Sequence, residues 1–592
     1  MGHNFHIPVL GLGFSIDTPL KVARYGISSV VSIVDDELTE RMRAYHAKEN
    51  NLSYHPISKK ENDYRAHRIT AYLNLLDDLV NQQFTDLKKL PFEVGNDLCK
   101  YFELLPEDSQ LKQGYDLMME YPEGESKVIF QNILRSSIKK GTIDVNIMAK
   151  VDKMNFKDDV FTGQENTDAL AALRGFATSN LQSSLILSAG MNPHLYGYIA
   201  NFPDFFPNEN GEIKKKIILK VSDFRSAFIQ AKFLAKKGLW ISEFRIESGL
   251  NCGGHAFATE GFLLGPILEE FKQKRNSMVD ELFQTYSNIL AEKNITIQTA
   301  PLQRVSVQGG IGTAKENEFL LNYYKVDGTG WGSPFLLVPE VTNVDDETLD
   351  KLTIAKEEDY YLSNVSPLGV LFNNFKYSSI NNLKDERIAK GRPGSPCTKK
   401  YLVSNTEFTT EPICTASREY QNLKIKQLAS LNLTEADYKK SFDIITEKVC
   451  LCEGLCSASY IKYDILKPKE NKAVAICPGP NLAYFSKTYS LEEMAKHIYG
   501  KLDLLAQIKR PHFFIKELNL YIDYLQTEIQ NHIADINEKK KKSLINFKQQ
   551  LQEGISYYKD LYAQVSTQTL FLKEMNYNDL LASEDKLKQT LI

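Results

Sequence analysis

The strongest constraint in this sequence is the alternation of short apolar runs with longer amphipathic helical patterns up to about residue 340. Eight runs predict β-strands, at 7–13, 27–34, 142–149, 183–189, 215–221, 239–247, 304–310 and 331–338. Helical patterns separate most of them, for example 168–179, 222–238 and 262–290. Strands that alternate with helices run parallel, with the helices as crossovers. Eight such units predict an α/β protein built on a closed (β/α)₈ TIM barrel, although an open doubly wound sheet also satisfies the count.

Two segments interrupt this alternation and divide the chain. The barrel is expected from residues 1–34 and 141–380, with a helical insertion at 35–140 after the second strand. Residues 381–500 form a cysteine-containing mixed extension, and 501–592 form a mostly helical region. In that last region apolar residues recur at helical spacing and predict an antiparallel hairpin with one apolar stripe: Leu518, Ile522, Leu525, Leu544, Phe547 and Leu551. The stripe could close a homodimer or pack on the barrel.

Charge and hydropathy exclude several classes of function. The formal net charge is −4, so no basic field favours nucleic acid or an anionic membrane. No apolar run reaches the roughly 18 residues that a bilayer span needs. The start of the chain, MGHNFHIPVLGLG, lacks the basic and long apolar segments of a signal peptide. We therefore expect a cytoplasmic protein.

Two glycine clusters follow one another near the end of the predicted barrel. VSVQGGIGTAKE (305–316) places Gly309 and Gly310 between a strand and a helix, where bare backbone N–H groups and the helix dipole favour an anion. VDGTGWGSPF (326–335) places Gly332 and Ser333 in the adjacent unit. By the barrel count these are the turns after strands seven and eight, where such barrels commonly bind phosphate. No Gly-Lys-Ser/Thr follows, so a nucleotide-hydrolysing loop is not expected.

Five dispersed motifs, in order, give the chain a recognisable likeness. They are IPVLGLGFSIDTP (7–19), DVNIMA (144–149), GLNCGGH (249–255), QGGIGT (308–313) and DGTGWGSPFL (327–336). Over roughly residues 5–34 and 140–380 the chain resembles the FMN-dependent nitronate monooxygenase (2-nitropropane dioxygenase) family, whose barrel is shared with FMN-type enoyl-acyl-carrier-protein reductases. The likeness is imperfect. The small-Pro-Met triplet of the family is Gly11, Leu12 and Gly13 here, and Asn251 and Cys252 stand where the family has Glu and Ala.

The resemblance implies FMN as cofactor and assigns roles to several residues. Asn146 would contact the flavin, and the turns with Gly309, Gly310, Gly332 and Ser333 would hold its phosphate. Gly11 belongs to the opening strand motif, while Gly253 and Gly254 would let the main chain approach the ring. His255 would be the catalytic base, because a neutral imidazole can remove a proton alpha to a nitro group.

The substrate would be a nitronate or similar small carbanion-stabilised molecule, oxidised with O₂. An NAD(P)H-dependent enoyl-thioester reductase on the same barrel is the alternative hypothesis. A flavin-binding partner protein of a biosynthetic complex is a third hypothesis. Lys220, at the end of the fifth predicted strand, could neutralise the flavin or a phosphate, or could be a surface lysine.

The cysteines gather in the extension. Six of the eight lie between residues 397 and 477, namely Cys397, Cys414, Cys450, Cys452, Cys456 and Cys477. Their spacing matches neither a zinc knuckle nor a ferredoxin run, and thiols are often simply buried. We expect no metal from the pattern, although a zinc site, an iron–sulfur cluster and a redox pair stay open. Cys252 lies close to His255 in sequence, but no oxyanion arrangement accompanies it, and we interpret it as a packing residue.

Overall fold

Eight parallel strands close into a barrel in the computed structural model of the chain, in the order β1-β10-β9-β8-β7-β6-β3-β2. The structure describes residues 2–148, 152–157, 160–188, 190–252, 260–532, 537–565 and 575–591. The barrel strands are β1 (Phe5–Ile7), β2 (Ser28–Ser32), β3 (Ile143–Ile147), β6 (Ser184–Leu187), β7 (Lys216–Val221), β8 (Ile241–Glu247), β9 (Arg304–Gln308) and β10 (Gly328–Gly330). The closed (β/α)₈ TIM barrel is therefore confirmed, and the open sheet is excluded.

Two of the predicted strands lie elsewhere than the sequence suggested. The first strand ends at Ile7, so the expected run 7–13 is mostly a loop above the barrel. The eighth strand is Gly328–Gly330, which pairs with Phe5 and His6 of β1. The expected strand 331–338 is wrong, because Ser333–Leu337 is a 3₁₀ helix. Pro334 has no N–H for a sheet hydrogen bond, and it stands in the first turn of that helix, where none is needed.

Helices between consecutive strands form the outer wall of the barrel. They are α1 (Thr18–Val22), α7 (Asp168–Ala177), α8 (Pro193–Ile199), α9 (Phe224–Ala235), α10 (Leu264–Glu292) and α11 (Ala314–Asn322). A two-stranded antiparallel sheet of β4 (Phe156–Lys157) and β5 (Val160–Phe161) precedes α7. Helix α12 (Asp346–Thr353) follows the barrel.

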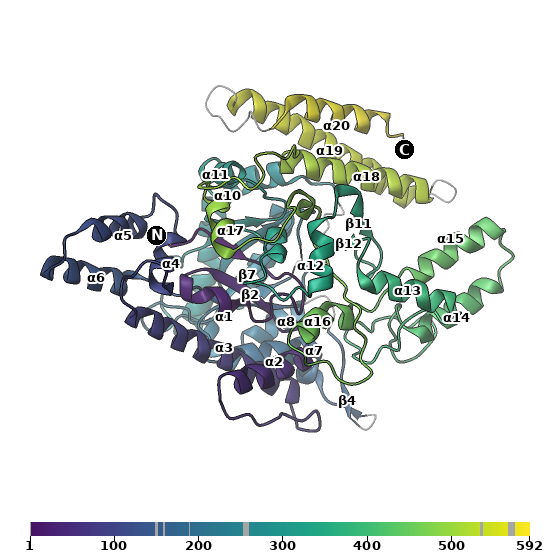
Figure 1. Cartoon of the computed structure of the whole chain (residues 1–592). Coiled ribbons are helices and arrows are strands. Elements are labelled where there is room, and N and C mark those ends of the chain that lie inside the picture. The colour runs from purple at the N-terminus through teal and green to yellow at the C-terminus, as the bar shows by residue number, and fades with distance from the viewer. Residues whose placement is uncertain are drawn as a thin grey trace.

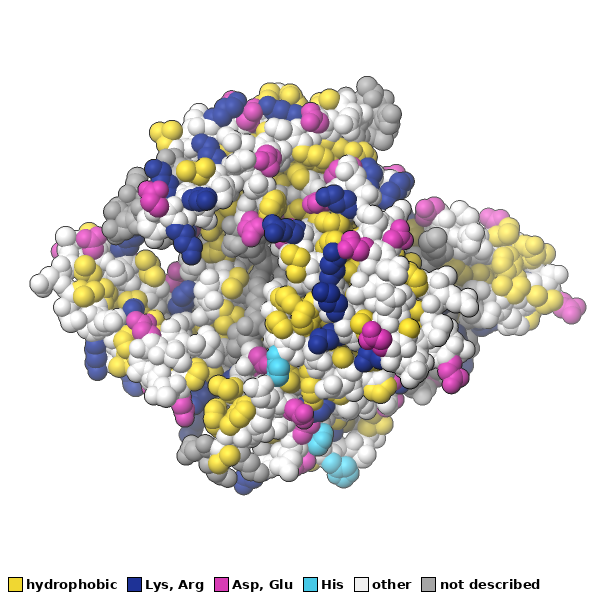
Figure 2. Space-filling view, turned by 180° about the vertical axis from the view of Figure 1, so that it is seen from behind, with side chains coloured by type: hydrophobic (Ala, Val, Ile, Leu, Met, Phe, Trp, Pro, Cys, Tyr) yellow, Lys and Arg dark blue, Asp and Glu magenta, His cyan; other side chains and the backbone are white. Residues whose placement is uncertain are grey.

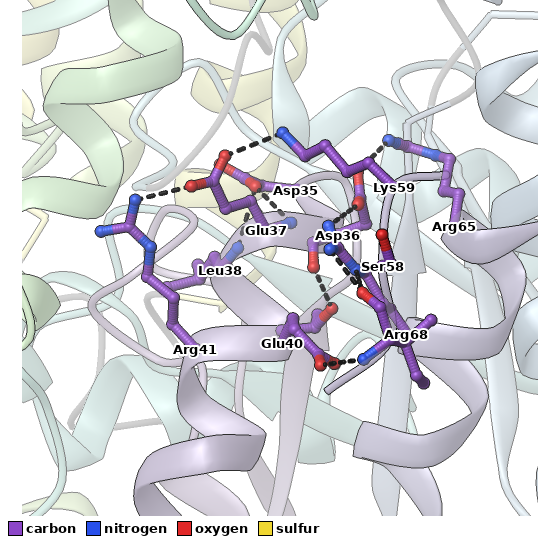
Figure 3. A network of polar contacts seen from close by, with 12 residues as sticks. Asp35, Asp36, Glu37, Leu38, Glu40, Arg41, Ser58, Lys59, Arg65 and Arg68 are labelled. Carbon is purple, nitrogen blue, oxygen red and sulfur yellow. Dashed lines mark hydrogen bonds and ion pairs between the residues drawn. The ribbon is translucent and has the colours of Figure 1, made fainter. Parts of the chain in front are cut away.

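The segment between β2 and β3 is helical, as predicted. It contains α2 (Asp36–Glu49), α3 (Tyr64–Lys89), α4 (Asp97–Glu103), α5 (Gln110–Glu120) and α6 (Glu125–Ser137). Asp36, the first residue of α2, accepts hydrogen bonds at 2.9 Å from both Arg65 and Arg68 of α3 (Figure 3). Two buried guanidinium groups on one carboxylate fix α2 and α3 to the carboxyl end of the second strand.

The chain beyond the barrel forms two further parts. The first contains the hairpin β11 (Tyr360–Ser363) and β12 (Phe372–Phe375), with α13 (Ser379–Ala389), α14 (Arg418–Ala429), α15 (Glu435–Thr446), α16 (Leu451–Lys462) and α17 (Leu491–Ile498). The second is a layer of α18 (Phe513–His532), α19 (Glu538–Val565) and α20 (Tyr577–Gln589). In Figure 1 this layer lies along one side of the barrel, at the top of the view, while α13–α15 and α4–α6 project on opposite sides.

The apolar stripe predicted at the C-terminus is buried within one chain. Leu518, Ile522 and Leu525 of α18 have no exposed surface, and Leu551 of α19 has none either. Helices α18 and α19 pack against α10 of the barrel wall and against each other. The stripe therefore gives no argument for a homodimer, and the oligomeric state stays a prediction.

Side chains inside the barrel form layers because every second strand residue points inward. Charged side chains are buried in the interior away from the mouth, among them Asp144, Glu243 and Arg245. A separate apolar cluster of Val9, Val30, Ile186 and Ile218 lies above them. Two residues further along their strands come Ser32, Ser188 and Lys220, which reach the carboxyl mouth. The interior of the barrel is thus filled by side chains toward the amino ends of the strands, and it leaves space for a ligand at their carboxyl ends.

The surface has mixed charge, in keeping with the small net charge. Lys and Arg side chains are interspersed with Asp and Glu over the face seen in Figure 2. Within the described ranges no helix combines the length and the hydropathy that a bilayer crossing requires.

Candidate active site

A cavity occupies the carboxyl mouth of the barrel, where enzymes of this architecture have their active sites. It encloses about 990 Å³ of non-atom space, including the part that opens to solvent. The strands contribute Ser32, Asn146, Ser188, Lys220 and Glu247 to its wall, and the loop after β1 contributes Val9, Gly11 and Leu12. Three residues assigned from the sequence, Gly11, Asn146 and Lys220, thus face one space.

Lys220 is paired rather than solvated. Its Nζ lies 2.8 Å from Oε1 of Glu247, and both side chains are buried apart from their contact with the cavity. The same oxygen of Glu247 accepts hydrogen bonds from the amide groups of Asn251 at 2.7 Å and Gln308 at 2.8 Å. Three donors on one oxygen hold the carboxylate rigidly at the cavity wall. The surface-lysine reading of Lys220 is therefore wrong.

The sequence motifs do not include Glu247, and they assign no role to Gln308, the first residue of QGGIGT. The signal available is the alternation of Glu243, Arg245 and Glu247 within the otherwise apolar strand β8. Alternate positions of a barrel strand face the interior, so three charged residues at that spacing must find partners there. Asn251, which replaces a glutamate of the resembled family, contacts Glu247, and a carboxylate is therefore present at this position of the site.

The roof of the cavity comes from the chain beyond the barrel and is largely apolar. Leu368 and Phe372 come from the β11–β12 region, Tyr401 and Leu402 from the loop after α13, and Leu451, Cys452 and Leu455 from α16. Helix α16 is fixed on the loop after β1, since the N–H of Gly13 donates to the carbonyl of Leu455 at 2.8 Å and Ser459 donates to the carbonyl of Gly13 at 2.6 Å. Lys399 anchors the preceding loop through a buried ion pair of 2.5 Å with Asp35. Residues distant in the sequence therefore cover part of the mouth of the barrel with an apolar roof.

The two predicted glycine turns meet in a second, much smaller cavity beside the first, with room for about one water molecule. Gly309, Gly310 and Ile311 line it from the turn after β9, and Gly330, Gly332 and Ser333 line it from β10 and the turn that follows. Gly310 has a φ of +80°, and a Cβ there would lie 2.5 Å from Leu250, so only glycine fits this turn. Within the described part of the chain, no protein acceptor is bonded to the N–H groups of Gly310, Ile311 and Gly332. Backbone amides of this kind are the donors that phosphate-binding turns use.

The helix after the first turn contributes less to this set of donors than the sequence suggests. Glu316 of α11 folds back in a capping box and accepts the N–H groups of Gly312 at 2.8 Å and Thr313 at 3.2 Å. Arg510 neutralises Glu316 at 2.6 Å and also donates to the carbonyl of Gly310. The amides of Gly312 and Thr313, directly before α11, are thus already bonded, and the glycine turns themselves supply the remaining donors.

The two cavities share a wall. Asn251 lines the small cavity and bonds Glu247 of the large one, and the thiol of Cys252 donates to the carbonyl of Cys477 at 3.1 Å across the same boundary. Cys252 is buried, and burial raises the pKa of its thiol well above the usual value. Its packing role fits this environment, because a neutral buried thiol is a poor nucleophile.

The segment with the predicted histidine is only partly described. Gly253, Gly254 and His255 lie outside the described residues, so the structure gives no position for them. The chain leaves β8 through Ser248 and Asn251, at the boundary between the two cavities, and re-enters described structure at Glu260. Both ends of this loop therefore belong to the carboxyl face of the barrel.

The clustered cysteines border the roof. Cys450, Cys452 and Cys477 belong to one buried apolar cluster with Tyr401 and Leu402. All eight cysteines of the chain are free thiols. Among the residues that the structure describes, no group of three or more His, Cys, Asp or Glu is arranged to hold a metal ion. The zinc and iron–sulfur readings therefore find no support in the geometry.

Comparisons with known proteins give a limited likeness. No protein-family model matches the chain, and no curated protein matches it in sequence. Among solved structures, the chain is similar to the enoyl reductase domain of MlnA from the macrolactin biosynthesis cluster of Bacillus amyloliquefaciens, with 13% identity over 64% of this chain and 84% of that one and a TM-score of 0.35. It is also similar to FabK from Thermotoga maritima, with 12% identity over 62% and 78% of the two chains and a TM-score of 0.30. The barrel itself is established by its own strand pairing.

Proposed function

We propose that the protein is an FMN-dependent oxidoreductase that acts on a small carbanion-stabilised substrate of the nitronate type. The observation that carries the proposal is the meeting of the two glycine turns in one small cavity that shares a wall with the large cavity at the mouth of the barrel. The glycine turns around the small cavity would offer backbone amides to a phosphate, and the large cavity would offer an apolar chamber to a planar ring. When bound, the flavin would supply the electron or hydride transfer.

The residues of the chain then have distinct tasks. The amides of Gly310, Ile311 and Gly332 would hold the phosphate, with Gly309 and Ser333 shaping the same turns. Asn146 and Gly11 would lie against the ring, and Lys220, held by Glu247, would place a positive charge at the wall. His255, carried by the loop after β8 with Gly253 and Gly254, would take a proton from the substrate, with O₂ as the oxidant.

Reduction of an enoyl thioester with NAD(P)H is the second candidate. The observation that favours it is the aliphatic roof of Leu368, Leu402, Leu451 and Leu455. A small nitronate does not need so much apolar wall, whereas an acyl chain gains roughly 0.8 kcal/mol for each methylene that it buries there.

The test is a titration of the purified chain with FMN, followed by visible absorption. The proposal expects one FMN for each chain. Anaerobic bleaching by a nitronate without response to NAD(P)H supports the nitronate assignment, and bleaching by NADPH supports the enoyl-thioester reductase. A chain that binds FMN yet responds to neither would be a flavin-binding partner protein, and a chain that binds no FMN contradicts the proposal. His255→Ala should retain FMN and lose turnover.

A further inference from the structure

The loop between β8 and α10 is held at both ends by one carboxyl group of the C-terminal layer. Glu517 of α18 is 1% exposed. Its Oε1 accepts the hydroxyl of Ser248 at 2.6 Å, at the start of the loop. Its Oε2 accepts the N–H of Leu264 at 2.8 Å, where the loop becomes α10. One side chain thus bridges two points of the barrel that are separated by the whole β8–α10 loop.

Aromatic side chains of the same layer pack closely against glycines at the two ends of the β8–α10 loop. A Cβ on Gly249 would lie 2.6 Å from the ring of Tyr521, one turn after Glu517 on α18. A Cβ on Gly265 would overlap the ring of Tyr558 on α19, whose hydroxyl accepts the N–H of Gly265 at 3.2 Å. The absence of side chains on both glycines lets α18 and α19 reach the loop ends, which explains how Glu517 comes within bonding distance of both.

The chemistry of Glu517 is unusual for a residue that only stabilises packing. Burial raises its pKa to about 7, against the hydrogen bonds from Ser248 and from the amides of Leu264 and Gly249. A buried carboxyl group costs free energy unless its oxygens are bonded, and apolar residues of similar volume stabilise a core at least as well. What a carboxylate provides and an apolar residue does not is two acceptors at a fixed separation, one for each end of the loop.

We propose that Glu517 is a positioning residue that ties the two ends of the loop containing His255, and that the C-terminal layer exists in part to supply it. The inference rests on the proposed function for its catalytic consequence, but the tie itself is independent of any ligand. It assigns a role in the active site to a helix that begins far beyond the barrel in sequence.

The test combines hydrogen exchange with kinetics on the full chain. Glu517→Gln keeps the shape of the side chain, and Ser248→Ala removes one of the two bonds. Glu528→Gln is the control, since Glu528 lies on the same helix and pairs with Lys540 of α19. We expect the amides of Gly249 and Leu264 to exchange at least about tenfold faster in Glu517→Gln, less so in Ser248→Ala, and at the wild-type rate in the control.

The kinetic readout separates positioning from stability. In Glu517→Gln we expect kcat to fall by about tenfold or more while the Kd for FMN and the Tm stay near those of the wild type. Glu517→Asp, whose carboxylate is one methylene shorter and reaches only one end, should fall as far as Glu517→Gln. Unchanged exchange at Gly249 and Leu264 in Glu517→Gln, or an equal change in the control, would overturn the inference. Faster exchange in a chain that binds no flavin would leave the tie intact and contradict only the proposed function.

Discussion

Strand β8 carries two buried carboxylates on its inward face, Glu243 and Glu247, and their surroundings differ. Glu243 lies near the amino end of the barrel, where Arg245 reaches it at 2.7 Å and Ser306 at 2.6 Å. Glu247 lies at the carboxyl mouth with Lys220, and it lines the large cavity, which Glu243 does not. The apolar cluster of Val30, Ile186 and Ile218 belongs to the interior between these two levels.

The difference shows how one strand can serve stability at one end and ligand binding at the other. At the closed end, burial opposes the ionisation of Glu243, but Arg245, His6, Arg304 and the hydrogen bond from Ser306 together outweigh burial and lower the pKa of Glu243 to about 2. Burial, helped by Arg245, lowers the pKa of nearby His6 to about 3. The closed end therefore contains the buried ion pair of Glu243 and Arg245, with the neutral imidazole of His6 beside it. At the mouth, the charge pair faces a space large enough for a ligand.

The largest expected effect is a difference in stability between variants of the two carboxylates, Glu243 and Glu247. Glu243→Gln removes the nearer carboxylate partner of Arg245 in a closed interior and leaves Asp144 at 3.9 Å, so we expect the free energy of unfolding to fall by about 3 kcal/mol. Glu247→Gln leaves Lys220 at a cavity that admits water, so its loss should stay below about 2 kcal/mol. Urea denaturation of both variants measures this, and equal losses would break the comparison.

The next largest effect is a difference in activity between variants at the two ends of strand β7. Lys220→Met should lower kcat/KM by about 100-fold, roughly 2.7 kcal/mol of transition-state stabilisation, with the Tm nearly unchanged. Lys216→Met is the matched control, because Lys216 begins the same strand with its side chain exposed. Similar activity of the two variants would show that the charge pair at the mouth has no role in turnover.

The pH dependence of stability sharpens the comparison further. The unfolded chain protonates His6 below about 6.5, whereas the folded chain does so only near 3, so stability is lost as the pH falls through this window. Glu243 adds a loss between 4.5 and about 2. Glu517 acts in the opposite direction, since its raised pKa removes stability as the pH rises from 4.5 to about 7. Urea denaturation between pH 4 and 8 should show a flatter acid limb for His6→Gln, and an unchanged limb would contradict the assignment.

The smallest effect concerns the roof of the open end. Leu455→Ala removes apolar surface above the cavity, and we expect KM for a substrate with an alkyl chain to rise about five- to tenfold with kcat unchanged. Comparing short and long chains measures this effect. A KM that rises equally for both would place the chain of the substrate elsewhere.

Much of the barrel could be predicted from the sequence, because strands such as 215–221 and 239–247 are apolar runs with helices between them. The eighth strand could not, since Gly328–Gly330 has no side-chain pattern and its pairing with β1 is a property of barrel closure. The positions of the two glycine turns could also be predicted from the sequence, because the backbone conformation of such turns depends on residue type. Their neighbour Glu316 was harder to anticipate, as a capping box and a phosphate site share the same local pattern.

The rest of the site depends on contacts between distant segments. Tyr401 and Leu455 roof the cavity from the far part of the chain, and Glu517 bonds Ser248 although hundreds of residues separate them. No local periodicity encodes such contacts. Lys220 shows the same limit, since its position on the strand was predictable and its partner Glu247 on the next strand was not.

The central claim is that the backbone amides of the turns after β9 and β10 bind the phosphate of a flavin at the open end of the barrel. The most direct measurement compares the affinities of the chain for FMN and for riboflavin, which differ only in that phosphate, by quenching of flavin fluorescence. Two or more hydrogen bonds to a charged group, at about 1.5–3 kcal/mol each, predict that FMN binds at least about 100-fold more tightly. Equal affinity for the two flavins would contradict the account.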